Sequence, residues 1–162
     1  MTDTTASKMK EKFWTQLSKS PLVMLELDNL PHSAVPMTAQ LDQDAHGAIW
    51  FFGSRRGPLA RMGPATATFA SKDHKLFARF SGVLTQEGSS TILHKLWSNG
   101  VSAWFPDGKD SPEVLLMRMD LGEASIWGTE VGALTLTKML LGVNVEREFK
   151  GQHAHTGLGA SL

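Results

Sequence analysis

Cysteine is absent from the 162 residues of the chain. This absence excludes disulfides, thiolate nucleophiles and cysteine-ligated metal sites, so any redox chemistry requires a cofactor. A net charge of either sign is also absent, because 16 basic residues balance 16 acidic ones. Global electrostatics therefore do not attract nucleic acid or a membrane surface, and we expect neither as a partner.

Long apolar runs are missing as well. No stretch approaches the roughly 18–20 apolar residues of a membrane span, and residues 1–8 lack the apolar core of a signal peptide, so a cytoplasmic location is expected. The motifs G-x-S-x-G, G-x-x-x-x-G-K-[ST] and H-E-x-x-H do not occur, which removes the simplest hydrolase, P-loop and zincin interpretations. We interpret His153-x-His155 as tail composition and predict no metal site. The remaining histidines are scattered and nominate no general base, so catalytic residues stay unassigned.

The residues that are present describe one soluble domain, with 41% hydrophobic and 20% charged residues. Alternating and aromatic runs predict strands in hairpin order, and the helical segments between them show no regular βαβ alternation. This pattern indicates an α+β protein, mainly antiparallel β, built as a barrel. Strands are expected at 22–27, 38–41, 49–52, 65–70, 76–85, 113–120 and 123–128, and helices at 8–19, 58–62, 89–97 and 132–142.

The sequence also predicts how some strands pair and where the domain ends. Segments 38–41 and 49–52, with turn residues between them, predict a hairpin, and Gly82 inside a strand predicts a β-bulge. Residues 1–149 form the predicted domain. Residues 150–162 lack an apolar period and are predicted to be a mobile tail that contributes nothing to the core.

A small basic turn follows the aromatic strand. In Gly53-Ser54-Arg55-Arg56-Gly57, backbone N–H groups, a hydroxyl and two guanidinium groups lie within five positions. Planar guanidinium groups bind phosphate bidentately, so this turn is a candidate anion site. The alternative is an ordinary solvated turn.

Four segments in a fixed order resemble one family. They are P-M-T-A-Q at 36–40, I-W-F-F-G-S at 49–54, L-W-S-N-G-V-S-A-W-F-P-D-G-K-D-S-P at 96–112 and L-L-M-R-M at 115–119. The chain resembles the general stress protein 26-like branch of the pyridoxamine 5′-phosphate oxidase-like FMN-binding split barrels over roughly residues 10–142. The resemblance implies a six-stranded split β-barrel with flanking helices and a homodimer that binds FMN, with FAD possible, between its subunits. It also implies a flavin-dependent oxidoreductase or flavin reservoir of general stress response type.

The same resemblance implies a set of site residues. The backbone of Val35, Pro36, Met37 and Thr38 would line the isoalloxazine beside Phe52 and Gly53. The flavin phosphate would bind Ser54, Arg55 and Arg56, and Trp104 and Trp127 of the other subunit would close the cleft.

Two residues depart from the family pattern. Val35 stands where flavin-binding members carry Arg, and Gly53 stands where they carry Thr. These departures leave flavin occupancy open and support an alternative, in which a non-catalytic split-barrel dimer that has lost FMN serves as a binding or interaction module. Pyridoxamine phosphate oxidation itself is not expected, because no R-x-H-x-R-type motif occurs in the late strand.

Overall fold

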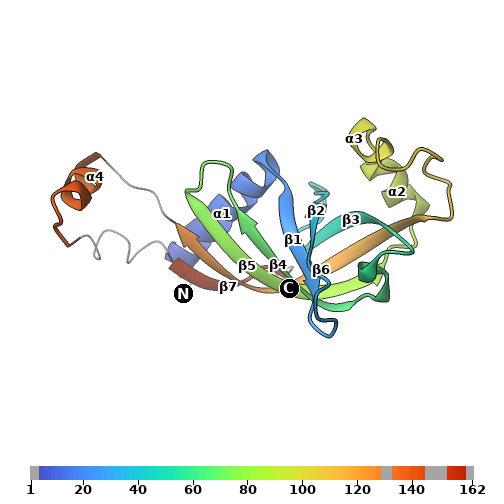
Figure 1. The fold of residues 1–162 in the computed structure, drawn as a ribbon, viewed down its shortest axis with the longest axis horizontal. Helices are drawn as coiled ribbons and strands as arrows, with labels where there is room; N and C mark the ends of the chain where they lie inside the picture. The colour runs from blue at the N-terminus through green and yellow to red at the C-terminus, as the bar shows by residue number, and fades with distance from the viewer. Residues whose placement is uncertain (1–3, 129–132, 145–152, 160–162) are drawn as a thin grey trace.

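The protein was analysed as a computed structural model, which describes residues 4–128, 133–144 and 153–159 (Figure 1). The elements in chain order are α1 (Thr4–Lys19), β1 (Leu22–Leu27), β2 (Val35–Thr38), β3 (Ala48–Ser54), the 3-10 helix η1 (Pro58–Arg61), β4 (Gly63–Ala70), β5 (Leu76–Gln86), α2 (Ser90–Leu96), α3 (Asn99–Ser102), β6 (Val114–Gly128), α4 (Ala133–Leu140) and β7 (His153–Gly157). None of the described helices is long and apolar enough to cross a membrane.

All strand pairs in the described sheet are antiparallel. Six strands follow the order β2-β1-β4-β5-β6-β3, and β7 pairs with β6. The two ends of this path, β2 and β3, do not form a ladder with each other; the chain after β2 meets β3 only at the bridge between Gln40 and Trp50, whose N···O distances are 2.7 and 3.0 Å. The sheet is therefore an open, split barrel, which confirms the predicted fold class.

The predicted hairpin of 38–41 and 49–52 is confirmed only at the antiparallel Gln40–Trp50 bridge, and the main ladders of the two segments are formed with other strands. Strand β2 pairs with β1, where Val35 lies opposite Leu25, and β3 pairs with β6, where Trp50 lies opposite Arg118. Strand β3 forms a seven-residue ladder with β6 on one edge, from Ala48–Asp120 to Ser54–Val114, and among the described residues its other edge meets the chain after β2 only at the Gln40–Trp50 bridge.

The fifteen-residue strand β6 is the spine of the sheet. One edge pairs with β5, and the other is shared by β3 over its first half and β7 over its second half (Figure 1). The β5–β6 register shifts between Phe80 and Gly82, which confirms the predicted bulge. A Cβ on Gly82 would lie 2.4 Å from the Asp120 carbonyl oxygen, so this close approach of two backbones requires glycine.

The core lies between α1 and the concave face of the sheet. Helix α1 places Met9, Phe13 and Leu17 on one face, as its spacing predicts, and all three are buried. The Phe13 ring meets Phe69 and Phe80 edge-on, with centroids 6.0 and 5.4 Å away. A smaller cluster under α2 contains Ala48, Trp50, Leu96 and Leu116.

The expectation of a mobile tail outside the fold is wrong for residues 153–159. Strand β7 pairs with β6 from Trp127–His153 to Glu123–Gly157, and Ala154 and Leu158 are buried. The Leu158 N–H also donates to the Gly122 carbonyl at 2.7 Å. The second half of β6 would otherwise present an unpaired edge, and β7 satisfies it. The alternation of His153 and His155 with Ala154 is the strand signal that the low hydrophobicity of the tail obscured.

We predict that Leu158→Ala destabilises the fold by about 2–5 kcal/mol, because it removes a fully buried side chain and leaves a cavity beside α1. Leu140→Ala is the matched control, since Leu140 is 81% exposed. Urea unfolding followed by Trp fluorescence measures both. Equal midpoints for the two variants would show that residues 153–159 do not pack on the core.

Candidate functional site

The end of β2 and the turn after β3 meet at Met37 and Gly53. A Cβ built on Gly53 would lie 3.8 Å from Met37 Cε and 2.8 Å from Met117 Cε. Two of the segments predicted to share a site are therefore adjacent. The Met117 methyl group is the end of a flexible side chain, so a larger residue at position 53 would displace it at little cost.

Strand β2 lies at an open edge of the described sheet. Its burial pattern alternates, with Val35 and Met37 half-buried toward the core and Pro36 and Thr38 exposed. Because β2 pairs only with β1, its other edge keeps backbone groups available to a ligand. Val35 carries no charge, and its side chain packs against the core instead of reaching the basic turn.

Backbone N–H groups of the basic turn donate hydrogen bonds to Ser54 and to the neighbouring Glu113. The Arg56 N–H donates to Ser54 Oγ at 3.2 Å, and the Arg55 N–H donates to the Glu113 carbonyl at 3.0 Å. The Arg56 guanidinium forms an ion pair with Glu113 at 3.1 Å, whereas the Arg55 side chain has no polar partner within the described residues. Among the residues that the structure describes, the turn thus offers one cation without a polar partner and one in an exposed ion pair with a carboxylate. Helix η1 has only four residues, too few for a strong helix dipole.

The predicted aromatic residues occupy different places. Phe52 meets Trp97 edge-on, with centroids 5.4 Å apart, so its ring belongs to the cluster under α2. Trp104 is 82% exposed, just after α3. Trp127 lies near the far end of β6 and stacks on His153 at 5.0 Å.

Trp127 and the basic turn are not brought together within one chain. Ser54 pairs with Val114 at the start of β6, and an extended strand rises about 3.3 Å per residue, so Trp127 is separated from that end by roughly 40 Å of strand. If Trp127 contacts a ligand at the turn, it does so from another subunit.

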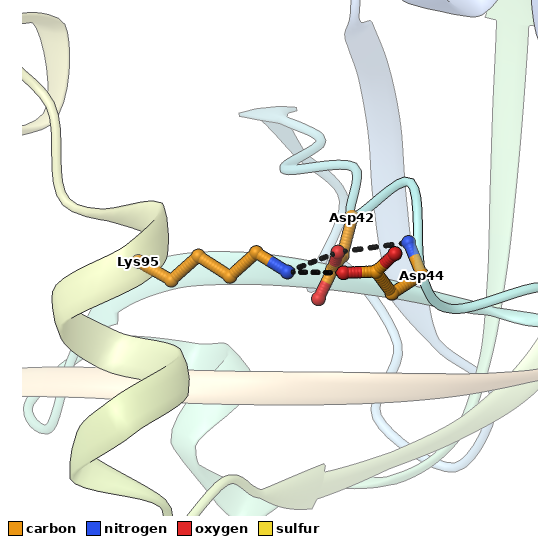
Figure 2. Close-up of polar contacts among 3 residues, drawn as sticks. All are labelled: Asp42, Asp44 and Lys95. Carbon is orange, nitrogen blue, oxygen red and sulfur yellow. Dashed lines mark hydrogen bonds and ion pairs between the residues drawn. The ribbon is translucent and has the colours of Figure 1, made fainter.

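A charged cluster that the sequence did not reveal ties α2 to the segment before β3. Lys95 Nζ lies 2.8 Å from Asp42 Oδ1 and 2.9 Å from Asp44 Oδ2, and the Asp44 N–H donates to Asp42 Oδ1 at 3.0 Å (Figure 2). The Asp42 side chain is only 5% exposed. The aspartates and Lys95 are more than fifty positions apart in the sequence, so no local spacing signals the contact.

These contacts shift the pKa values of Asp42 and Lys95. Donation from Lys95, followed by donation from the Asp44 N–H, holds the pKa of the Asp42 carboxyl below its ordinary value. The hydrogen bonds to Asp42 and then Asp44 raise the pKa of the Lys95 ammonium group. Asp42 and Lys95 are therefore both charged near neutral pH, and their ion pair holds α2 against the segment before β3.

A cavity of about 570 Å³ lies on the other side of the Asp42 segment, between α1 and residues 39–48. None of the predicted site residues lines it. Its walls are mostly apolar and include Lys10, Trp14, Leu41, Asp42, His46 and Leu158.

The sequence profile of the family described as pyridoxamine 5′-phosphate oxidase like matches residues 8–149. The chain belongs to this family. Within it, similarity to solved structures supports the general stress protein 26 branch. A comparison with curated proteins gave no match.

Two solved structures illustrate the similarity of this pyridoxamine 5′-phosphate oxidase-like chain to that branch. A structure assigned to general stress protein 26 from Jannaschia sp. CCS1 is 25% identical, with a TM-score of 0.76 over 93% of this chain and 99% of the other. The general stress FMN/FAD binding protein from Xanthomonas citri is 37% identical, with a TM-score of 0.71 over 78% of this chain and 92% of the other.

We predict that Asp42→Asn lowers the stability of this pyridoxamine 5′-phosphate oxidase-like protein at neutral pH but not in acid. A carboxyl whose folded-state pKa is depressed contributes stability above its unfolded pKa, about 4, and loses it as the pH falls through the lower folded value. The urea midpoints of parent and variant should differ at about pH 7 and approach each other as the pH is lowered below about 4. Asp107→Asn, in the exposed loop after α3, is the control. A gap that persists unchanged in acid would contradict the assigned cause.

Proposed function

We propose that this protein binds a flavin, FMN foremost and FAD as a second candidate, and acts as a flavin-dependent oxidoreductase of general stress response type. The observation that carries the proposal is the proximity of Met37 to Gly53, whose Cβ position would lie 3.8 Å from Met37 Cε, because it sets the free edge of β2 beside the strand end that leads into Arg55. Family membership supports it. So does the 37% identity to a protein named as FMN/FAD binding.

The hydroxyl and the guanidinium group of the basic turn can bind a phosphate group with a single cation. In this proposal Ser54 and the unpaired Arg55 bind the flavin phosphate, and Arg56 joins them when it leaves Glu113. The backbone of Val35 to Thr38, beside Phe52 and Gly53, orients the ring system. The flavin, when bound, supplies hydride and electron transfer, while the protein supplies position, charge and exclusion of water.

We further propose a homodimer, in which Trp104 and Trp127 of the partner subunit close the cleft. Four large apolar side chains on the outer face of the sheet are 40–59% exposed: Leu22, Met24, Phe77 and Trp127. Phe77 and Trp127 are opposite each other in the β5–β6 ladder. An exposed apolar face of this kind is typical of a protein–protein contact.

A second candidate function has its own support. Val35 supplies no phosphate ligand, and Glu113 already occupies Arg56 at 3.1 Å. Both features favour a non-catalytic split-barrel dimer that has lost FMN and serves as a binding or interaction module. The absorption spectrum of freshly purified protein separates the two, since only the first predicts flavin bands.

The parent protein should show a dimer mass by light scattering at micromolar concentration. Met24→Lys should shift the mass toward the monomer, because it places a charge on the apolar outer face. Thr15→Lys, on the exposed side of α1, should leave the mass unchanged. A monomeric parent would refute the homodimer.

Flavin affinity should respond to the charges around the basic turn. Charge-assisted hydrogen bonds contribute about 1.5–3 kcal/mol, so Arg55→Ala should weaken FMN binding by roughly ten- to a hundredfold. Val35→Arg, whose long stem keeps some apolar contact, should tighten it by about as much. Glu113→Gln, which frees Arg56 from an exposed ion pair, should tighten it by at most about fivefold, since such a pair contributes up to about 1 kcal/mol.

Titration of FMN fluorescence at one fixed salt concentration measures all the variants. Arg61→Ala is the control, because Arg61 is exposed but lies outside the turn. If none of the three variants changes the affinity, the turn is not a flavin phosphate site and the non-catalytic interpretation is favoured.

A further inference from the structure

The cavity between α1 and residues 39–48 is separate from the basic turn. Its volume is about 570 Å³, within the range of about 300–1,000 Å³ in which proteins bind small organic molecules. Neither the proposed flavin ligands nor the exposed apolar side chains of the outer sheet face line it. The homodimer proposed above uses that outer face, so its formation does not involve the cavity.

One stripe of α1 forms the first wall of the cavity. Lys10, Trp14 and Ser18 follow one another at intervals of four residues and therefore lie on the same side of the helix. The Trp14 ring is half-buried, and its centroid is 5.2 Å from that of the buried Phe13. This packing fixes a flat apolar surface along the cavity.

Hydrogen bonds fix the opposite wall, which residues 39–48 form. The Ala39 N–H donates to the Pro21 carbonyl at 2.7 Å, and the Leu121 N–H donates to the Gly47 carbonyl at 2.9 Å. Both ends of this segment are thus tied to neighbouring parts of the fold. Because both walls are in place beforehand, a bound molecule does not have to order them, which lowers the entropic cost of binding.

The charges around the cavity favour an anion. Asp42 lines it, but its side chain is only 5% exposed and its carboxylate is bonded to Lys95, so that charge is already balanced. Lys10 has no hydrogen bond or ion pair with any other residue that the structure describes. Its flexible four-carbon stem lets the ammonium group reach a carboxylate at the mouth of the cavity. The lining therefore suits one negative charge on an apolar body.

We propose that this cavity binds aromatic carboxylates of one or two fused rings, independently of any flavin. The ring system lies along Trp14 between the apolar walls, and the carboxylate pairs with Lys10. Stacked aromatic rings attract each other beyond the effect of buried area alone, so the flat Trp14 surface favours an aromatic body over an alkyl chain. Binding alone is proposed, with no bond made or broken.

The test is a titration of the full-length, ¹⁵N-labelled protein with 2-naphthoate, followed by the NMR shifts of the backbone amides. We expect the amides of residues 39–48 and of α1 around Trp14 to shift together and to saturate with a Kd below about 1 mM. Naphthalene-2-carboxamide, which has the same shape without the charge, and decanoate, which has the charge without the ring, should each bind at least about threefold more weakly.

Two variants separate the charge from the ring. Lys10→Met should weaken 2-naphthoate by about fivefold and leave the carboxamide unchanged, because only the charged probe loses a partner. Trp14→Leu should weaken 2-naphthoate by at least about threefold and leave decanoate nearly unchanged. Lys8→Met is the matched control, since Lys8 is an exposed lysine of the same helix that does not line the cavity. It should bind 2-naphthoate like the parent.

Three results would overturn the proposal. The first is an absence of saturation at millimolar 2-naphthoate, and the second is a set of shifts confined to the basic turn around Arg55. The third is an equal loss of affinity in Lys10→Met and Lys8→Met, which would show that the net charge of the helix, not a contact in the cavity, attracts the carboxylate.

Discussion

The fold depends on satisfying both backbone edges of β6. A fifteen-residue strand inside a small protein presents more N–H and C=O groups than one neighbour of ordinary length can pair. Strand β5 covers one edge, and the other is divided between β3 and β7, which come from opposite ends of the sequence. The division point near Leu121 is also where the Gly82 bulge re-aims β5. The barrel stays split because the second edge of β3 meets the chain after β2 only at the Gln40–Trp50 bridge in the described sheet.

The sharing of one β6 edge between β3 and β7 also decides which polar side chains meet at each end of β6. At its start, the β3 ladder sets the basic turn against Glu113, so the strand pairing that presents Arg55 also presents the carboxylate that neutralises Arg56. Toward its end, β7 places His155 opposite Ser125. Both polar clusters arise from backbone register, because opposed residues of neighbouring strands have their side chains on one face.

The sequence predicted correctly those elements whose pattern depends only on neighbouring residues. The amphipathic period of α1, the aromatic run of β3 and the glycine of the bulge each report on their own surroundings, and each is confirmed. Pairing partners were not predictable in this way, since the β3 segment has the same alternation whether β2 or β6 lies beside it. Strand β7 was missed because its only buried residue is Ala154 and its exposed positions carry histidine, so hydrophobicity gave no signal.

The same difference between local and non-local patterns explains which parts of the candidate site could be predicted from the sequence. The basic turn was recognisable because its donors are consecutive, whereas Glu113 lies fifty-seven positions after Arg56 and its effect is visible only in the ladder. The Asp42–Lys95 contact is likewise non-local, yet it has a clear consequence: it fixes α2, and α2 holds Phe52 through Trp97. Because that ring is held in the α2 cluster, the residues of this chain left to meet a ligand at the turn are the β2 backbone, Ser54 and Arg55. In the proposed flavin site, the exposed Trp104 and Trp127 of a partner subunit would supply the contacts that a single available cation does not.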